Sequence, residues 1–160
     1  MAKIYPKQIP LEVEKDPKRK AERILFNCFK ELLNDQITIY YSRNWRDFQI
    51  NKKNKNSYFV NGEADFVIVW PDYGILVVEC KGGGIEIKEG NFFSTDRNFQ
   101  KIKIKDPYKQ AYNSRYRIIE HILYKKLLCR DKFELSQSIL DGVFFPQSSR
   151  SNWGKFDIDQ

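Results

Sequence analysis

The sequence predicts a single α/β domain in which a central mixed β-sheet is flanked by α-helices. Two long stretches, 16–35 and 106–128, carry apolar residues at helical spacing. Shorter β-branched and aromatic runs lie between them, and one more follows the second helix. The order helix, strands, helix, strand is typical of a sheet between helices. A chain of 160 residues suits one domain, and we expect its core to span about 17–146.

The two helices begin with the same signal. Asp16 and Asp106 are natural N-caps, and each precedes a proline that suits the first helical position. The face expected to be buried in the first helix consists of Ala21, Ile24, Leu25, Cys28, Phe29 and Leu32. In the second helix it consists of Tyr108, Ala111, Tyr112, Ile119, Ile122 and Leu123.

The other segments predict strands, loops and an irregular start. Residues 1–15 are mixed in character and predict an irregular arm. The remaining expectations are a strand at 37–45, a lysine-rich loop at 51–57, an apolar hairpin within 62–84, two short strands within 84–94 turning at Glu89-Gly90, and a last strand at 141–146. The tail at 147–160 carries no clear element, which leaves open whether the chain continues as part of a longer protein.

Composition favours a polyanion partner. Lysine and arginine number 28 against 21 acidic residues, giving a net charge of +7. This balance suits DNA or RNA, although a soluble basic surface without a partner gives the same count. Cys28, Cys80 and Cys129 form no close pair, which argues against a zinc ribbon, and their odd number argues against a disulfide framework. No segment resembles a signal peptide or a membrane span. We therefore expect a cytoplasmic protein with no membrane partner.

The ends of the apolar hairpin carry charged residues, and their arrangement depends on the loop length. If residues 71–73 form a three-residue loop, Asp65 lies opposite Glu79. Opposed residues share a sheet face, with Cβ atoms roughly 5 Å apart. A four-residue loop would instead put Asp65 opposite Cys80 and separate the carboxylates. The odd-length loop therefore predicts a carboxylate pair.

A carboxylate pair indicates a cation site. Asp65 and Glu79 would repel each other, and a hard divalent cation such as Mg²⁺ removes the conflict. Lys81 points the same way as Glu79 by the period of two, and Glu63 would lie opposite it. An alternative is that these charges form exposed salt bridges on a solvated face. Two observations favour the site: the triple glycine that follows Lys81, and the apolar residues of the same face, which are Val67, Val69, Ile75 and Val77.

At these residues the sequence resembles the PD-(D/E)XK nuclease superfamily. Within it, the stretches GEADFVIV and VVECKGGG are similar to the nuclease-related domain family, known as NERD. The resemblance covers roughly 17–146, and it departs from the superfamily pattern at Ala64, where a proline is typical. The ordered set that carries it is Glu22, Gly62-Glu63, Asp65, Glu79, Lys81 and Gln110.

The resemblance implies a restriction-endonuclease-like fold and a role for each matching residue. Asp65 and Glu79 would bind Mg²⁺ or Mn²⁺, with the Cys80 carbonyl as a further ligand. Lys81 would orient the attacking water. Two residues from flanking helices, Glu22 and Gln110, would support the site. The family also implies a helicase domain, fused or associated, because it often stands at the N-terminus of longer chains.

Other polar residues have ordinary alternatives. Glu22 can be a solvated charge and Gln110 a capping residue. His121 suits a helix face better than a general base. Further candidates for contacts with nucleic acid are Lys101, Lys103 and Lys105 along phosphates, and Tyr112, Arg115 and Tyr116 beside bases, although core packing is another use of the tyrosines.

We therefore expect a metal-dependent nuclease domain, an endonuclease or exonuclease, that hydrolyses phosphodiester bonds of DNA. Two other classes remain open: a non-catalytic nucleic-acid-binding module, and a protein-interaction module of a larger helicase-type protein. Binding that weakens steeply with salt would distinguish a nucleic-acid partner from an apolar interface.

Overall fold

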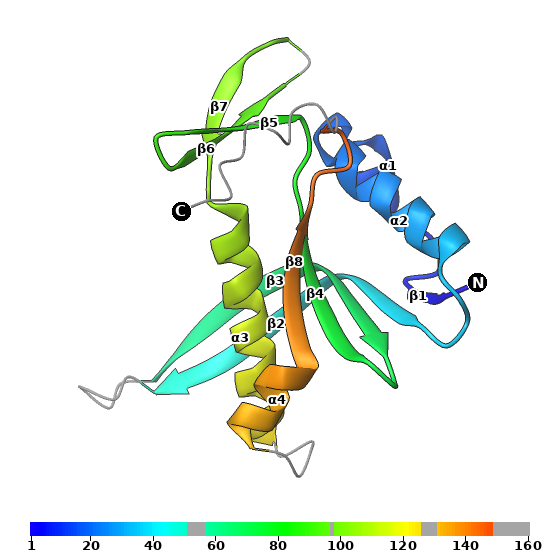
Figure 1. The fold of residues 1–160 in the computed structure, drawn as a ribbon, viewed down its shortest axis with the longest axis vertical. Coiled ribbons are helices and arrows are strands. Elements are labelled where there is room, and N and C mark those ends of the chain that lie inside the picture. The colour runs from blue at the N-terminus through cyan, green and yellow to red at the C-terminus, as the bar shows by residue number, and fades with distance from the viewer. Residues whose placement is uncertain (51–56, 97, 126–130, 149–160) are drawn as a thin grey trace.

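The computed structural model describes residues 1–50, 57–96, 98–125 and 131–148 (Figure 1). Its elements are, in chain order, β1 (Lys3–Tyr5), α1 (Leu11–Lys15), the 3-10 helix η1 (Pro17–Arg19), α2 (Lys20–Leu32), β2 (Thr38–Ile50), β3 (Ser57–Trp70), β4 (Gly74–Cys80), β5 (Gly84–Lys88), β6 (Asn91–Thr95), β7 (Lys101–Ile104), α3 (Pro107–Lys125), α4 (Lys132–Ser138) and β8 (Ile139–Phe144).

In the described part of the chain, five strands form a mixed sheet in the order β1-β2-β3-β4-β8. The outer pairs β1/β2 and β4/β8 are parallel, whereas β2, β3 and β4 are antiparallel neighbours. A smaller antiparallel sheet, β5-β6-β7, stands beyond the first turn of α3 (Figure 1). The mixed sheet between helices confirms the predicted α/β class and is consistent with a restriction-endonuclease-like fold.

The middle strands of the main sheet bury both faces, because helices cover both. One core cluster joins α1 and α2 to the sheet and includes Phe26, Phe66 and Ile68. The other joins α3 and α4 to the opposite face and includes Val67 and Ile119. Alternate residues of β3 therefore belong to different cores, as the period of two requires. This explains why the hairpin sequence is almost continuously apolar.

The two predicted helices are present, with shifts in detail. The Asp16 carboxylate accepts the Lys18 N–H at 2.8 Å, and a 3-10 turn precedes α2. Leu32, in the last turn of α2, is exposed, and so are Tyr108 and Tyr112 on α3. The buried residues of α2 are Ala21, Leu25, Phe26 and Phe29. None of the described helices is long and apolar enough to cross a membrane.

The predicted strands are also present, but one expectation was wrong and one helix was not predicted. Residues 1–15 form β1 and α1 rather than an irregular arm, and α4 was not expected. β1 and α1 contain three and five residues, too few to show a period in the sequence. For α4 a signal existed, because Asp131 and Glu134 form a capping box. Residues 51–56, Cys129 and 149–160 lie outside the described part of the chain.

The hairpin between β3 and β4 has the predicted three-residue turn. Trp70 pairs with Gly74, and the ladder continues in that register to Phe66 and Val78. Gly74 has φ of +109°, and a Cβ there would lie 2.1 Å from the Ser138 carbonyl oxygen. The turn therefore requires glycine both for its backbone conformation and for its contact with the segment before β8.

Replacing Gly74 should destabilise the domain more than replacing the other turn glycine, Gly90. Gly90 has φ of +70°, but a Cβ added there would meet no atom within 4 Å, so Gly90→Ala tests backbone strain alone. We expect Gly90→Ala to lower the free energy of unfolding by about 1–2 kcal/mol. Gly74→Ala must also displace Ser138, so its loss should reach about 3 kcal/mol or more. Urea unfolding measures both; equal losses would contradict the role of the Ser138 contact.

Candidate active site

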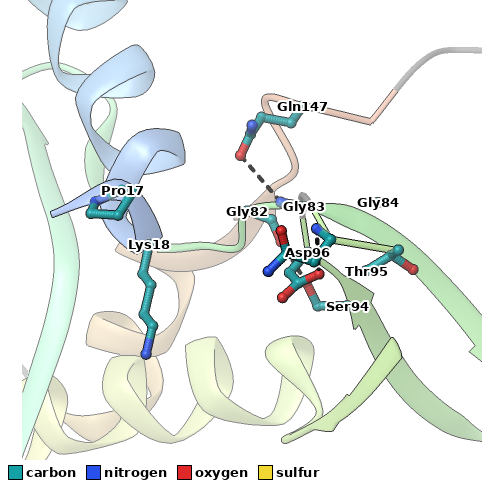
Figure 2. Close-up of a pocket in the computed structure, with 10 residues that line it drawn as sticks. Pro17, Lys18, Gly82, Gly83, Gly84, Ser94, Thr95, Asp96 and Gln147 are labelled. Atoms are coloured by element: carbon teal, nitrogen blue, oxygen red, sulfur yellow. Dashed lines mark hydrogen bonds between the residues drawn. The ribbon is translucent and has the colours of Figure 1, made fainter. Parts of the chain in front are cut away.

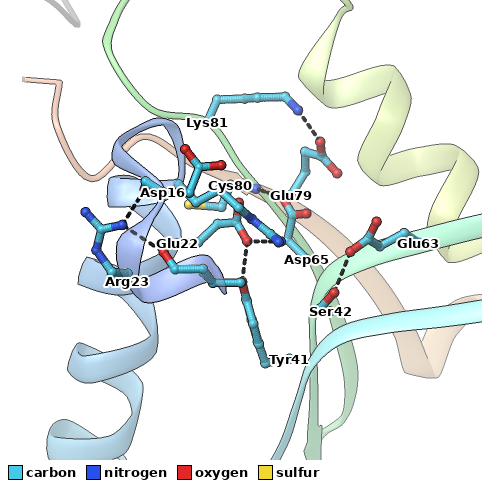
Figure 3. A network of polar contacts seen from close by, with 12 residues as sticks. Asp16, Glu22, Arg23, Tyr41, Ser42, Glu63, Asp65, Glu79, Cys80 and Lys81 are labelled. Atoms are coloured by element: carbon cyan, nitrogen blue, oxygen red, sulfur yellow. Dashed lines mark hydrogen bonds and ion pairs between the residues drawn. The ribbon is translucent and has the colours of Figure 1, made fainter. Parts of the chain in front are cut away.

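The candidate site lies where β3 and β4 stop pairing. Phe66 and Val78 form the last pair of their ladder, and Asp65 and Glu79 come directly beyond it. The Asp65 carboxylate accepts a hydrogen bond from the Cys80 N–H at 2.8 Å (Figure 3). This side-chain bond connects β3 and β4 beyond the last backbone pair of their ladder. This bond fixes the Asp65 carboxylate at the end of β4.

The neighbouring strand β2 is distorted at the same level. Its register passes from the pair Tyr41–Phe66 to the pair Arg43–Ala64. Ser42, which lies between them, has φ of +49°, a left-handed conformation that is uncommon for a residue other than glycine. Such backbone distortions are frequent beside functional sites.

Glu79 and Lys81 project toward each other from the end of β4 (Figure 3). The Lys81 ammonium donates to the Glu79 carboxylate at 2.5 Å. Glu79 is only 5% exposed, which is rare for a carboxylate unless it is paired. The Lys81 N–H in turn donates to the Phe144 carbonyl on β8 at 3.0 Å, which anchors the backbone below this pair.

The Asp65 carboxyl is electrostatically unfavourable in this position. Burial raises the pKa of Asp65 most, and the negative charge of Glu79 raises it further. The hydrogen bond from the Cys80 N–H lowers this pKa. Of the two smaller effects, the charge of Glu22 raises it and that of Lys81 lowers it. The result is a pKa of about 7 against an ordinary value of 3.8. The ionised form of Asp65 is therefore disfavoured here, and a bound cation would stabilise it.

Glu22 reaches the site from α2, and its negative charge is balanced by hydrogen bonds from neighbouring side chains. Its carboxylate accepts two hydrogen bonds from Arg19, at 2.8 and 2.6 Å, and one from the Tyr41 hydroxyl at 2.6 Å. Its side chain is 14% exposed, so it is not the solvated surface charge that was the alternative. Burial and the bond to Glu22 raise the pKa of Tyr41 above its usual range. This clamp connects α2 to β2 beside Asp65.

Gln110 lies in the first turns of α3 and is partly buried. Four residues later on the same helix face, the Ser114 hydroxyl donates to the Glu63 carbonyl at 3.2 Å, so this face contacts β3. The Gln110 Oε1 atom is buried and has no hydrogen-bond partner within the described residues. A buried acceptor without a partner is costly, which distinguishes Gln110 from an ordinary capping residue.

The expected pairing of Glu63 with Lys81 was wrong. The Glu63 carboxylate accepts a hydrogen bond from Ser42 at 2.5 Å and is exposed, while Lys81 contacts Glu79. The β3/β4 ladder ends before it reaches residue 63, so its register no longer decides which side chains meet.

The other candidates for nucleic-acid contacts have mixed surroundings. Lys101 pairs with Glu86 at 2.5 Å, Lys103 is exposed, and β7 ends before Lys105. The rings of Tyr112 and Tyr116 stack with centroids 6.2 Å apart. The Arg115 guanidinium donates to the carbonyls of Ile139 and Ser136 and to the Asp141 carboxylate, so it is already bound within the protein. His121 lies partly buried on α3.

Sequence reasoning missed Arg19 and Tyr41. Arg19 precedes Glu22 by three residues, and that spacing in a helix is a recognised signal for an ion pair. Tyr41 comes from a different element, and no sequence pattern connects it to Glu22. Only the packing of α2 on β2 brings the hydroxyl and carboxylate together.

The donor set suits a hard cation that keeps part of its water shell. Within the described residues, no three His, Cys, Asp or Glu side chains cluster to hold a metal ion. Asp65 and Glu79 supply two carboxylates, and the Cys80 carbonyl lies between them in the chain. Magnesium is commonly held by one or two carboxylates with waters and substrate oxygens, so these residues fit it better than a metal that needs an all-protein cage.

Comparison with known families gives one match. The model of the nuclease-related domain, NERD, matches residues 17–145. The chain therefore belongs to the NERD family, whose context is the PD-(D/E)XK superfamily. No curated protein and no solved structure matches the chain.

The raised pKa of Asp65 predicts a pH-dependent stability in the absence of metal. The folded protein holds this proton up to about pH 7, whereas the unfolded chain loses it near 3.8. The resulting contribution to stability is present at low pH and is lost as pH rises through the folded pKa. Asp65→Asn mimics the protonated form, so it should raise Tm at pH 8 in EDTA and have little effect at pH 4.

Thermal unfolding at the two pH values tests this, and the control is Asp72→Asn on the exposed turn of the same hairpin. That change should leave Tm nearly the same at both pH values. A gain for Asp65→Asn that is equal at pH 4 and pH 8 would show that its carboxyl ionises normally.

Proposed function

We propose that this nuclease-related domain is a metal-dependent nuclease that hydrolyses phosphodiester bonds of DNA. The observation that supports it best is the meeting of Asp65, Glu79 and Lys81 at the end of one hairpin, with two acids crowded beside a partly exposed lysine. Functional sites often contain a carboxyl whose pKa is raised by burial and by a nearby like charge, as the pKa of Asp65 is.

In this proposal Asp65, Glu79 and the Cys80 carbonyl would hold Mg²⁺ or Mn²⁺. When bound, the ion would polarise the scissile phosphate and make a coordinated water more acidic. The charge of Asp65 supports such binding, because no lysine or arginine forms an ion pair with it among the described residues. Glu22 would stay outside the innermost ligands, since Arg19 and Tyr41 already occupy its oxygens.

Lys81 would act on the water and on the phosphate. Its ammonium is held by Glu79 and remains partly open to solvent, with 25% of the side chain exposed. From there it could hold the attacking water through a hydrogen bond and offset the negative charge that grows on the phosphate oxygens. The unpartnered Gln110 Oε1 would accept a hydrogen bond from a water at the site.

A net charge of +7 supports a nucleic-acid partner, DNA or alternatively RNA. We infer that such a domain serves a longer DNA-processing protein, with a helicase domain fused or associated. A second candidate is a non-catalytic binding module of that protein. The existing Lys81–Glu79 ion pair favours it, because this bond is complete without any cation.

Neutralising Asp65 distinguishes a nuclease from a non-catalytic binding module. Asp65→Asn keeps the shape of the side chain and its acceptor for the Cys80 N–H, but it removes one charge from the cation site. We expect cleavage of plasmid DNA in Mg²⁺ to fall by orders of magnitude. Binding of DNA in EDTA should stay unchanged or become slightly tighter, since lysines and arginines supply that affinity.

The control is again Asp72→Asn, which should cleave and bind as the wild type does. If the wild type cleaves no DNA or RNA with Mg²⁺ or Mn²⁺ and Asp65→Asn binds equally well, the binding module is the correct function.

Replacing Gln110 tests whether it serves catalysis or stability. Gln110→Met fills a similar volume and removes the buried acceptor, so the free energy of unfolding should stay the same or rise. Cleavage in Mg²⁺ should nevertheless fall. The matched change Gln137→Met, on an exposed position of α4, should alter neither quantity. Full activity in a stabilised Gln110→Met protein would exclude Gln110 from the site.

A further inference from the structure

A cavity lies beyond the end of β4, and the proposed hydrolysis leaves it without a role. Its volume is about 620 Å³, and it is lined by the glycine triplet that directly follows Lys81 (Figure 2). Further walls come from η1, from the turn between β6 and β7, and from Gln147 beyond β8. The volume is in the range of sites for small ligands, roughly 300–1,000 Å³.

Packing explains the first two glycines of the triplet. A Cβ on Gly82 would lie 2.9 Å from the Gln147 amide oxygen. Gly83 has φ of +84°, and a Cβ there would lie 2.5 Å from the Ser94 hydroxyl. The same neighbours bind the triplet: Gln147 accepts the Gly83 N–H at 3.1 Å, and Ser94 donates to the Gly82 carbonyl at 2.9 Å. These glycines therefore hold the cavity wall together.

Packing does not explain Gly84. It begins strand β5 and is exposed, and the nearest atom to a Cβ there is the Thr95 Cβ at 3.8 Å, an ordinary contact. Glycine weakens a strand, so a glycine that the fold does not need indicates a close approach of something else to the backbone. The missing side chain leaves the cavity open at this point.

Asp96 on the opposite wall is hydrogen-bonded to described residues that follow it in the chain. The Asp96 carboxylate accepts the N–H groups of Asn98 and Gln100 at 2.8 and 2.9 Å, which closes the turn after β6. Asp96 and Asn98 both line the cavity, and so does Thr95. Residues with a carboxylate, an amide and a hydroxyl thus line the same space.

This chemistry suits a nucleobase better than a phosphate. Carboxylate and amide groups recognise the amino and ring groups of base edges, whereas Asp96 would repel a phosphate. Lys18, on the η1 side of the same cavity, supplies a positive charge for the backbone of the strand. Gly82 of the cavity wall directly follows Lys81 in the chain, so the cavity and the candidate site are joined by adjacent residues.

We infer that this cavity takes one unpaired nucleotide of the strand next to the scissile phosphate, with its base among Thr95, Asp96 and Asn98. The inference rests on the proposed function for its choice of nucleic acid as ligand. A base inside a duplex is stacked and paired, so it must leave the duplex to enter such a space. The domain therefore prefers single-stranded or locally opened DNA to an intact duplex.

A change that fills the cavity tests this inference. Gly84→Leu places a side chain in the open space while leaving Asp65, Glu79 and Lys81 intact. In EDTA, fluorescence anisotropy with a labelled single-stranded 12-mer should give affinity about tenfold weaker than for the wild type, the scale of one lost base contact. Gln137→Leu, on exposed α4, should bind as the wild type does. Equal affinities of wild type and a folded Gly84→Leu protein would overturn the inference.

A second measurement uses the wild type and needs no variant, so it decides the matter even where Gly84→Leu does not fold. The 12-mer is compared with an abasic oligomer that has the same number of phosphates, and with the duplex of the same sequence. Tighter binding of the base-bearing single strand than of both others supports the cavity. Equal binding of the 12-mer and the abasic oligomer, or duplex binding as tight as single-strand binding, overturns it.

These assays in EDTA are independent of cleavage. A wild type that never cleaves would overturn the nuclease function and leave the binding result standing. Equal binding of the 12-mer and the abasic oligomer would remove the nucleotide cavity and leave metal-dependent cleavage untouched.

Discussion

The candidate site depends on the register of the hairpin formed by β3 and β4. A three-residue turn at Gly74 fixes that register, and the ladder delivers Asp65 and Glu79 to the same end of the two strands. A slip of one residue would turn one of these side chains to the opposite sheet face. The hydrogen bond from Cys80 to Asp65 then holds the two strand ends together where the backbone pairing has stopped.

The three acids at this point differ in how their charge is balanced. Glu22 has Arg19 and Tyr41, and Glu79 has Lys81. Asp65 has a backbone N–H and stands close enough to the other two for their charges to raise its pKa. Of the three, Asp65 is therefore the carboxyl whose ionised form is least compensated by neighbouring positive charge. Such a site reduces the stability of the metal-free fold, which is typical of residues retained for chemistry.

Much of the fold could be predicted from the sequence, because its signals are local. The Asp-Pro helix starts, the apolar alternation of the hairpin and the turn at Glu89-Gly90 each depend on a few adjacent residues. The three-residue turn followed from the sequence as well, and the register that it fixes brings Asp65 and Glu79 to the end of the β3/β4 ladder, although the ladder itself stops at Phe66 and Val78. Three-residue β1 and five-residue α1 could not be recognised, since neither is long enough to show a period.

The surroundings of the site could not be derived in the same way. Tyr41 reaches Glu22 through the packing of α2 on β2, and the cavity beside Lys81 is assembled from four separate segments. The misplacement of Glu63 has a similar cause, because pairing rules hold only while the ladder lasts. Sequence periodicity describes elements, whereas contacts between elements depend on how their surfaces meet.

We propose that this hairpin end forms a cation-dependent catalytic site for phosphodiester hydrolysis. The most direct test is to incubate the purified wild-type chain with supercoiled plasmid and with linear DNA in Mg²⁺, in Mn²⁺ and in EDTA, and to follow the products on gels. We predict nicked, linear or shortened DNA with either metal and intact DNA in EDTA. Intact DNA under all three conditions, or equal cleavage in EDTA, would contradict the claim.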